Sequence, residues 1–221
     1  MEPQSAIDIV GKFAQATFVT VQITLGAGLV AWLAAFAAGL CKLSEFRLVN
    51  WPVTAIVEAV RGTSCYVQLF WLYFVLPFIG VEISAMTVAI LAIGLNVGCY
   101  GSEVVRSSIL AVPRGLREAA RALNMSHTQT MVNVVLPDAF PRMLPPMCNL
   151  MVDLLKITPL VSLVTIADLT FLGQIYRQEA GSPLQAFGIL LVIYFLLSSL
   201  IIHGFRRAEI WASKGFEGTR G

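Results

Sequence analysis

The stretch Leu184–Ile202 constrains the fold more than any other part of the chain. It contains no charged side chain, and as a helix its 19 residues extend for about 28 Å at about 1.5 Å per residue. The hydrocarbon core of a bilayer is about 30 Å thick, so the length of this helix matches it. We therefore expect this segment to span a membrane.

Further apolar runs recur along the chain and together predict an all-α, polytopic membrane protein. Of its 221 residues, 57% are hydrophobic and 13% are charged, about half the charged share of a soluble domain. We expect residues 1–221 to form a single membrane domain with five transmembrane helices. These are Thr17–Leu40, Cys65–Val81 with a bend at Pro77, Ser84–Val105, a fourth that begins after Pro145-Pro146 and is interrupted at Pro159, and Leu184–Ile202. Small residues in the first span should allow close helix packing.

The distribution of Lys and Arg predicts which side of the membrane each loop occupies. With the N-terminus outside, only Lys12 and Arg177 lie outside, and Arg61 and Lys156 lie near or within the membrane. The remaining eleven basic residues are cytoplasmic: Lys42, Arg47, Arg106, Arg114, Arg117, Arg121, Arg142, Arg206, Arg207, Lys214 and Arg220. Cytoplasmic loops are enriched in basic residues, so this asymmetry predicts an N-out, C-in topology. The loop of about residues 106–142 is then cytoplasmic.

The residue types that carry catalysis or bind metals are sparse and scattered. The four cysteines, Cys41, Cys65, Cys99 and Cys148, are isolated in apolar surroundings and are expected to be unpaired. His127 and His203 are isolated as well, so an intramembrane enzyme or a metal site is not expected. The chain also lacks the Gly-x-x-x-x-Gly-Lys motif that cradles nucleotide phosphates. If ATP provides the energy, it binds to another polypeptide, and no nucleic-acid partner is expected.

A polar, arginine-flanked segment lies in the cytoplasmic loop, where Glu118-Ala119-Ala120 is followed by Asn124 and then by Val134 and Leu136-Pro137. This order resembles the EAA loop of ABC-importer permeases. The family pattern is Glu-Ala-Ala, three residues, Gly, nine residues, Ile, one residue and Leu-Pro. The matching residues are Glu118, Ala119, Ala120, Leu136 and Pro137, with Val134 in place of Ile and Asn124 in place of Gly. Asn is the second choice after Gly for the left-handed residue that ends a helix. We expect a helix from near Pro113 through Leu123, followed by a short helix capped by Ser126.

The chain also resembles the polar amino-acid permeases of ABC uptake systems over about residues 55–175. The matching segments are Arg61-Gly62-Thr63, Val67-Gln68-Leu69, Leu95-Asn96 with Tyr100, Glu103 and Arg106, Val112–Gly115, Leu144–Pro146, Asn149, Leu154–Lys156, Thr158 and Leu160–Ser162. Ser64 stands where the family has Pro. The resemblance implies a type I importer permease in the bacterial plasma (inner) membrane. It assigns ATPase coupling to Glu118, Ala119, Ala120 and Asn124.

The same resemblance implies the partners of the chain. These are ATPase subunits, a second identical or homologous permease subunit, an extracytoplasmic solute-binding protein and the lipid membrane. ATP and Mg would be held by the ATPase, and this chain would bind no cofactor.

A polar stripe in the fourth span marks a candidate solute pathway. Asn149, Asp153 and Lys156 follow one another at spacings of four and three residues, so they lie on one face of a helix. An ionisable pair at membrane depth normally faces a protein interior or an aqueous cavity, and broken helices such as the one at Pro159 recur at transport sites. A purely structural Asp153–Lys156 salt bridge accounts for the spacing equally well.

Other polar residues near the membrane are open to two interpretations. Asn96 and Tyr100, four residues apart, either line the pathway or make hydrogen bonds between helices. Thr158 completes the candidate pathway set. Glu58 and Arg61 share a face of the short helix Val53–Arg61, where they form either an anchoring ion pair or part of a gate.

The solute is the least constrained part of the prediction. Ala122–Ser126 and Leu163–Phe171 look most like permeases for ectoine or hydroxyectoine, so we favour ATP-driven uptake of a small zwitterion of this kind. Polar amino acids are the alternative, and an ATP-independent carrier or channel is a remote one. The sequence leaves open the exact solute, the choice between homodimer and heterodimer, and whether the membrane cavity contacts the solute.

Overall fold

The computed structural model describes residues 3–180 and 182–213, and within these ranges it contains helices and no strands. The helices in chain order are α1 (Pro3–Cys41), α2 (Arg47–Arg61), α3 (Cys65–Phe70), α4 (Ala85–Leu110), α5 (Arg114–Ala122), α6 (His127–Thr130), α7 (Leu136–Ile157), α8 (Leu169–Ala180) and α9 (Pro183–Ser213). Two π-helical turns, Trp71–Val75 and Met131–Val135, and two 3-10 turns, Leu76–Ile79 and Thr158–Val164, connect some of them.

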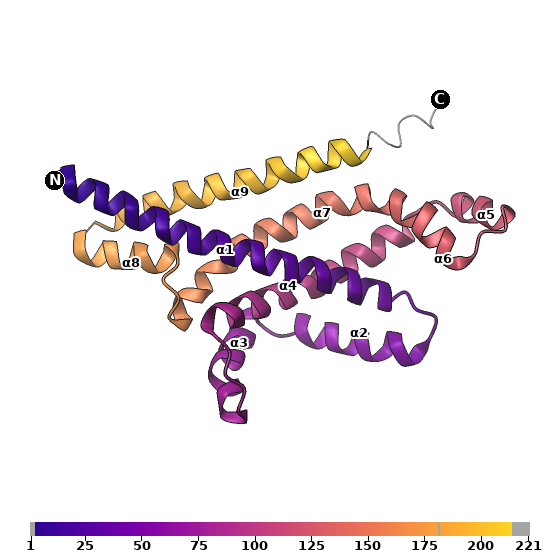
Figure 1. Ribbon diagram of the computed structural model, residues 1–221, viewed down its shortest axis with the longest axis horizontal. Helices are drawn as coiled ribbons and strands as arrows, with labels where there is room; N and C mark the ends of the chain where they lie inside the picture. The colour runs from indigo at the N-terminus through magenta and orange to yellow at the C-terminus, as the bar shows by residue number, and fades with distance from the viewer. Residues whose placement is uncertain (1–2, 181, 214–221) are drawn as a thin grey trace.

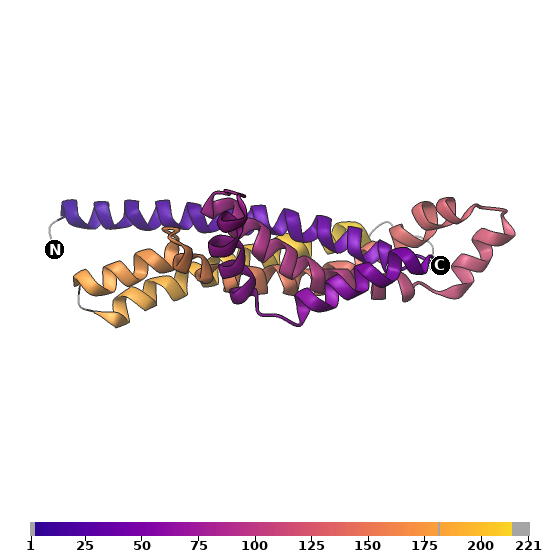
Figure 2. The ribbon, with the colours of Figure 1, turned by 90° about the horizontal axis from the view of Figure 1, so that it is seen from below.

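The long helices lie along one axis of an elongated, flat bundle. Figure 1 shows α5 and α6 at one end of this axis and α8 at the other, beside the beginning of α1. Figure 2 shows that the molecule is much thinner when it is turned by 90°. The beginning of α1 and the end of α9 lie toward opposite ends, as an odd number of membrane spans requires.

Four helical segments are long and apolar enough to cross a membrane: Asp8–Cys41, Ala85–Leu110, His127–Val164 and Pro183–Ser213. A fifth span exists if α2 and the segment Cys65–Ile79 are counted together, and these two parts meet at an angle of 99°. The prediction of an all-α polytopic membrane protein is confirmed, with four candidate spans, or five if the bent pair is counted as one. The N-out orientation stays a prediction, and Lys214 and Arg220, which contribute to it, lie outside the described residues.

The 99° turn of the second span does not lie at Pro77, where the sequence predicts a bend. The chain turns between Gly62 and Ser64, where α2 ends and α3 begins. Pro77 instead lies at the start of a 3-10 turn, where the missing backbone N–H has no helical partner to lose. α2 is also longer than the predicted helix Val53–Arg61, because it begins at Arg47 and keeps Pro52 inside.

The prediction that the fourth span begins after Pro145-Pro146 is also wrong. α7 begins at Leu136 and contains both prolines, so part of the predicted loop of residues 106–142 is helical. Proline disfavours a helix interior, but here the packing of the neighbouring side chains outweighs this cost. Met143 and Met147, which flank the prolines, are 0% and 1% exposed. The interruption at Pro159 is confirmed, because α7 ends at Ile157 and a 3-10 turn follows.

The core is built on close contact between α1 and α4. A Cβ added to Gly98 of α4 would lie 2.7 Å from the Cβ of Ala34 and 2.9 Å from the carbonyl oxygen of Ala31. The small residues of the first span therefore allow the close packing that was predicted. Cys41, Cys65, Cys99 and Cys148 are free thiols in this fold, also as predicted.

Candidate functional site

The local structure around α5 agrees with the prediction from its sequence. Pro113 precedes the first turn, and Asn124 follows the last one with a φ of 55°, the left-handed conformation that Asn tolerates. The backbone N–H of Met125 donates to the carbonyl oxygen of Ala120 at 3.1 Å, and the N–H of Asn124 donates to that of Arg121 at 2.9 Å. These two bonds form a Schellman motif, which ends the helix at a defined residue.

The next helix begins with an equally defined cap. The hydroxyl of Ser126 accepts the backbone N–H of Gln129 at 3.3 Å, and the side chain of Gln129 accepts the backbone N–H of Ser126 at 2.9 Å. This capping box confirms the predicted role of Ser126. The turn between α5 and α6 is thus fixed on both sides, so α5 is presented in one orientation at the end of the molecule (Figure 1).

The two central alanines of α5 lie on different faces. Ala120 is 3% exposed and is buried within this chain. On the opposite side, Gly115, Glu118, Ala119 and Ala122 are exposed. A Cβ at Gly115 would have no atom within 4 Å, so the chain's own packing does not require a glycine there. The exposed side of α5 thus carries small residues and the Glu118 carboxylate, with the exposed Arg114 and Arg121 beside them, and it is suited to close contact with a partner.

The inner side of the α5–α6 turn is positively charged. A cavity of about 180 Å³ lies there, and Arg117, Arg121 and His127 contribute to its walls without any carboxylate among the lining residues. The guanidinium of Arg117 also donates to the carbonyl oxygen of Ile109. This bond ties α5 to the end of α4.

The polar stripe predicted on the fourth span lies on an exposed face of α7. Asn149, Asp153 and Lys156 are all exposed, and the Lys156 Nζ lies 3.3 Å from the Asp153 Oδ1. Both charged side chains are 64% exposed. Met151 lies beside Gly28 of the span Asp8–Cys41, and the ion pair belongs to the apolar segment His127–Val164, so it lies within the length of the helices that can cross a membrane. The predicted salt bridge is present, and it is open to any group that approaches this face.

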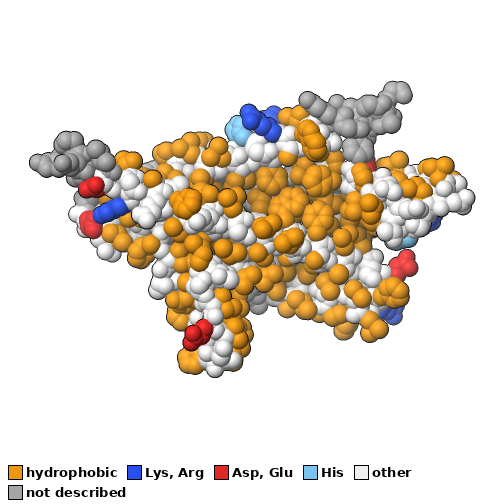
Figure 3. All heavy atoms as spheres, in the orientation of Figure 1, with side chains coloured by type: hydrophobic (Ala, Val, Ile, Leu, Met, Phe, Trp, Pro, Cys, Tyr) orange, Lys and Arg blue, Asp and Glu red, His pale blue; other side chains and the backbone are white. Residues whose placement is uncertain are grey.

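The exposed face of α7 differs from the exposed faces of α1 and α9. The exposed residues of those two helices include Leu25, Leu29, Leu33, Phe195, Leu196 and Leu200. Figure 3 shows hydrophobic side chains across the middle of one broad face, with charged side chains near its ends and edges. Such a surface suits lipid, whereas a charged residue at the bilayer centre costs about 2.5–3.5 kcal/mol or more. The Asp153–Lys156 face therefore requires water or another protein chain.

The other candidate pathway residues do not share this face. Asn96 is 6% exposed, and its Nδ2 donates to the Gln68 Oε1 at 3.1 Å. Thr158 is 0% exposed, and its hydroxyl donates to the carbonyl oxygen of Leu155 at 2.8 Å. Asn96 therefore links two helices, and the Thr158 hydroxyl is used within its own helix end, at the break before Pro159.

Tyr100 and the Glu58–Arg61 pair are connected. The Tyr100 hydroxyl donates to the carbonyl oxygen of Arg61 at 3.1 Å, and the Arg61 guanidinium lies 5.2 Å from the centre of the Tyr100 ring. The Arg61 Nη1 lies 2.9 Å from the Glu58 Oε1, so the predicted ion pair is present. These contacts hold the end of α2 against α4.

Sequence reasoning missed the residue that joins these groups. The side chain of Lys42, which directly follows α1, is only 5% exposed and forms an ion pair with Glu103 of α4. Its Nζ also lies 3.8 Å from the Glu58 Oε1 of α2, and the Arg106 Nε lies 3.1 Å from the second oxygen of Glu103. Lys42 was counted only as a basic loop residue. A signal was present, since Glu103 is an acid within an apolar span and needs a partner.

Comparison with known proteins adds a family to this geometry. A model of the family "Binding-protein-dependent transport system inner membrane component" matches residues 28–208. The chain is 38% identical to the probable amino-acid ABC transporter permease protein y4tF of Sinorhizobium fredii, over 90% of this chain and 86% of that protein. It is 34% identical to the L-cystine transport system permease protein TcyB of Bacillus subtilis, over 86% of this chain and 83% of that protein. It is 32% identical to the glutamine transport system permease protein GlnP of Escherichia coli, over 92% and 93%.

Solved structures resemble the fold over nearly its full length. A crystal structure of an amino acid ABC transporter with histidines superposes with a TM-score of 0.84 at 28% identity, covering 95% of this chain and 98% of that one. An inward-facing structure of the MetNI methionine ABC transporter has a TM-score of 0.77 at 21% identity, over 96% and 99%, and so supports the fold alone.

Proposed function

Because this chain belongs to the binding-protein-dependent transport system inner membrane components, the permeases of ABC importers, we propose that it carries a polar amino acid across the membrane. The chain is a transporter subunit and not an enzyme. The observation that carries the proposal is the exposed Asp153–Lys156 pair on a helix that is long and apolar enough to cross a membrane, in a chain whose relatives are named as amino-acid permeases.

The ion pair offers one charge for each end of an amino acid. The Asp153 carboxylate is suited to an α-ammonium group, and the Lys156 ammonium to an α-carboxylate. When no solute is present, the two side chains neutralise each other at 3.3 Å. A zwitterion that exchanges with this pair is never left with an unpaired charge in a low-dielectric passage, where such a charge is heavily penalised.

Ectoine, the solute favoured in the sequence analysis, receives less support. The relatives above are named for amino acids, L-cystine and glutamine. The segment that suggested ectoine, Leu163–Phe171, is also largely structural. Asp168 is 0% exposed and accepts the backbone N–H groups of Thr170 and Phe171 at the start of α8. Burial raises the pKa of this carboxyl group, although the two backbone bonds lower it. Asp168 therefore has a structural role at the start of α8.

The remaining parts of the importer follow from the exposed surfaces. A second permease subunit, identical or homologous, would cover the polar face of α7 and complete the passage. ATPase subunits that bind ATP and Mg would dock on the exposed face of α5, and an extracytoplasmic binding protein would deliver the solute at the α8 end. Closure of the ATPases would move two permeases as rigid bodies within the bacterial inner membrane.

Replacement of Asp153 with Asn tests the role of the ion pair. The change removes the group that faces the solute ammonium and leaves Lys156 unpaired, so we expect uptake to fall by about tenfold or more, for a loss of about 1.5–3 kcal/mol from a charged hydrogen bond. The measurement is uptake of labelled glutamine, cystine and ectoine by cells that contain the full set of subunits. We expect the wild type to take up a polar amino acid and not ectoine, and we expect Asp153→Asn to reduce the uptake of that amino acid.

The double variant Asp153→Asn/Lys156→Met separates a solute contact from a structural salt bridge. It removes both charges, so no unpaired charge remains in the membrane. If uptake stays low while the complex still assembles, the pair acts on the solute. Full recovery of uptake would show that the pair is structural and that selectivity belongs to the binding protein.

A further inference from the structure

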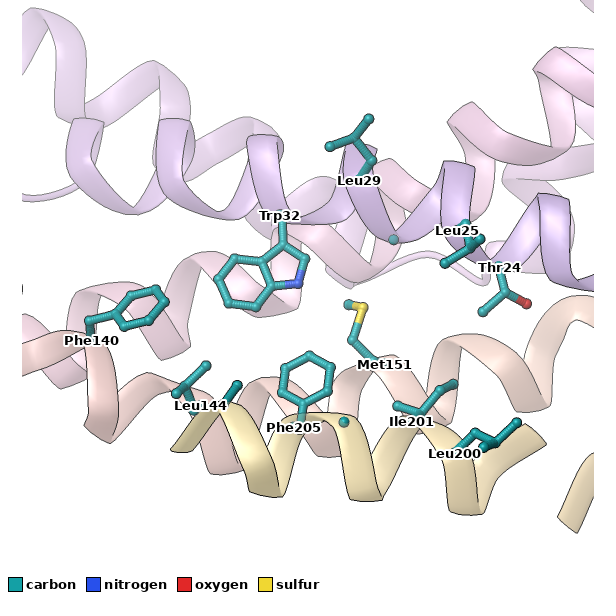
Figure 4. Close-up of a pocket in the computed structure, with 13 residues that line it drawn as sticks. Thr24, Leu25, Leu29, Trp32, Phe140, Leu144, Met151, Leu200, Ile201 and Phe205 are labelled. Carbon is teal, nitrogen blue, oxygen red and sulfur yellow. The ribbon is translucent and has the colours of Figure 1, made fainter. Parts of the chain in front are cut away.

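An apolar groove of about 500 Å³ separates α1 from α9 and has α7 as its floor. Figure 4 shows Trp32, Met151 and Phe205 pointing into it from the three helices. The Trp32 ring lies 6.3 Å from the Phe205 ring and 6.5 Å from the Phe140 ring, measured between centroids. Thr24 is the one lining residue with a polar side chain besides the Trp32 indole. The groove therefore suits a hydrocarbon chain and no polar solute.

The groove faces away from the polar face of α7. At 3.6 residues per turn, the floor residues Leu144 and Met151 lie roughly 150° around the helix from Asn149, Asp153 and Lys156. A second permease subunit that covers the polar face thus leaves the groove open. The helices on both sides of the groove expose leucines such as Leu29 and Leu200 to the surroundings. The bilayer is therefore the medium next to the groove.

One basic side chain lies at the edge of the groove. The lining residues of α9 run from Leu200 to Ala208, in the C-terminal half of that helix. Arg206 and Arg207 are both exposed. At 3.6 residues per turn, Arg207 lies on the same side of α9 as the lining residue Leu200, whereas Arg206 lies on the side opposite the groove. Among the residues that the structure describes, neither arginine forms an ion pair within 4.0 Å. Basic side chains beside transmembrane helices on the cytoplasmic side bind anionic lipid headgroups.

We propose that this groove binds an anionic phospholipid of the cytoplasmic leaflet, with one acyl chain between Trp32 and Phe205 and its phosphate against Arg207. The cytoplasmic leaflet follows from the predicted N-out topology, which places the C-terminal halves of α1 and α9 on that side. The lipid fills the space between α1 and α9, which pack instead on α4 and on α7 and α8. It is thus an integral contact between two helices and not part of the exchanging annular lipid.

Two glycines of α9 allow a matched test. A Cβ added to Gly204, which lines the groove, or to Gly188, which does not, would have no atom within 4 Å. Gly204→Phe should fill the groove without distorting the helix, whereas Gly188→Phe places the same side chain outside it. The complex is purified in detergent, supplied with dioleoyl phosphatidylglycerol or dioleoyl phosphatidylcholine, and bound lipid is counted by native mass spectrometry.

The wild-type complex and Gly188→Phe should retain phosphatidylglycerol, and Gly204→Phe should bind it roughly tenfold or more weakly, because the ring occupies the acyl-chain site. Arg207→Gln should reduce phosphatidylglycerol toward the level of phosphatidylcholine, whereas Arg206→Gln, on the opposite side of α9, should leave it unchanged. Equal retention by the two phenylalanine variants would overturn the proposal, and so would equal retention of the two lipids by the wild type. A photocrosslinker at position 29 that captures a second copy of the chain in native membranes would overturn it as well. Lipid retention is read without any uptake measurement, so its failure is distinct from a failure of the amino-acid proposal.

Discussion

Ala119→Trp is expected to weaken association of the ATPase subunits strongly while the permease still folds and enters the membrane. Ala119 lies on the exposed face of α5 together with Glu118, Ala122 and Gly115. A large side chain in a close contact overpacks it at a cost of about 1–3 kcal/mol, which weakens association roughly fivefold to 150-fold. The measurement is the amount of ATPase that co-purifies with the tagged permease, with ATP-driven uptake as a second readout.

Two further variants show whether the exposed face is responsible. Ala119→Ser adds only a hydroxyl and should keep nearly normal association. Ala120→Trp should behave differently from Ala119→Trp, because Ala120 is buried within this chain and its enlargement disrupts the loop itself. We expect reduced thermal stability of the permease in that case. Normal co-purification by Ala119→Trp would show that the exposed face of α5 is a solvated surface and not the docking site.

Lys42→Met is expected to destabilise the permease by about 2–3 kcal/mol, because it leaves Glu103 and Glu58 without their shared cation. The lysine side chain is 5% exposed and the Glu103 side chain 30%, so the effect is below that of a fully buried pair. The loss should appear as a lower midpoint of thermal unfolding in detergent. It should also loosen α2 from α4, since the carboxylates of these helices meet at Lys42.

Two control variants accompany Lys42→Met: one replaces an exposed lysine of helix α1, and the other also neutralises Glu103. Lys12 is exposed on the same helix α1, so Lys12→Met should leave the unfolding midpoint unchanged. The double variant Lys42→Met/Glu103→Gln also removes the carboxylate that has lost its buried lysine partner and keeps only Arg106, and it should recover part of the loss, which a double-mutant cycle quantifies. If Lys42→Met unfolds at the wild-type temperature, the ion pair makes no net contribution to stability.

Residues whose local chemistry decides their structure were predicted correctly. The φ of 55° at Asn124 and the capping box of Ser126 depend on a few neighbouring residues, so the sequence alone indicates them. The break at Pro159 is of the same kind. The family pattern of Glu118, Ala119 and Ala120 also identified α5 as the exposed helix at the end of the molecule, and its coupling role stays a prediction.

Features that depend on packing between distant segments could not be predicted in this way. Pro145 and Pro146 indicated a helix boundary, yet the buried methionines on either side keep α7 continuous. The burial of Ala120, in contrast to Ala119, depends on how the α5–α6 turn folds back. The Lys42–Glu103 pair joins residues that are 61 positions apart, and no spacing rule connects them.

The central claim is that this permease takes up a polar amino acid at the expense of ATP hydrolysed by a partner. The most direct measurement is uptake of labelled amino acids and ectoine into proteoliposomes that contain the purified complex, with binding protein and solute outside and ATP and Mg inside. We expect accumulation of a polar amino acid that requires both ATP and the binding protein and is lost with Ala119→Trp. Accumulation of ectoine alone, or solute movement that proceeds equally without ATP, would contradict the account.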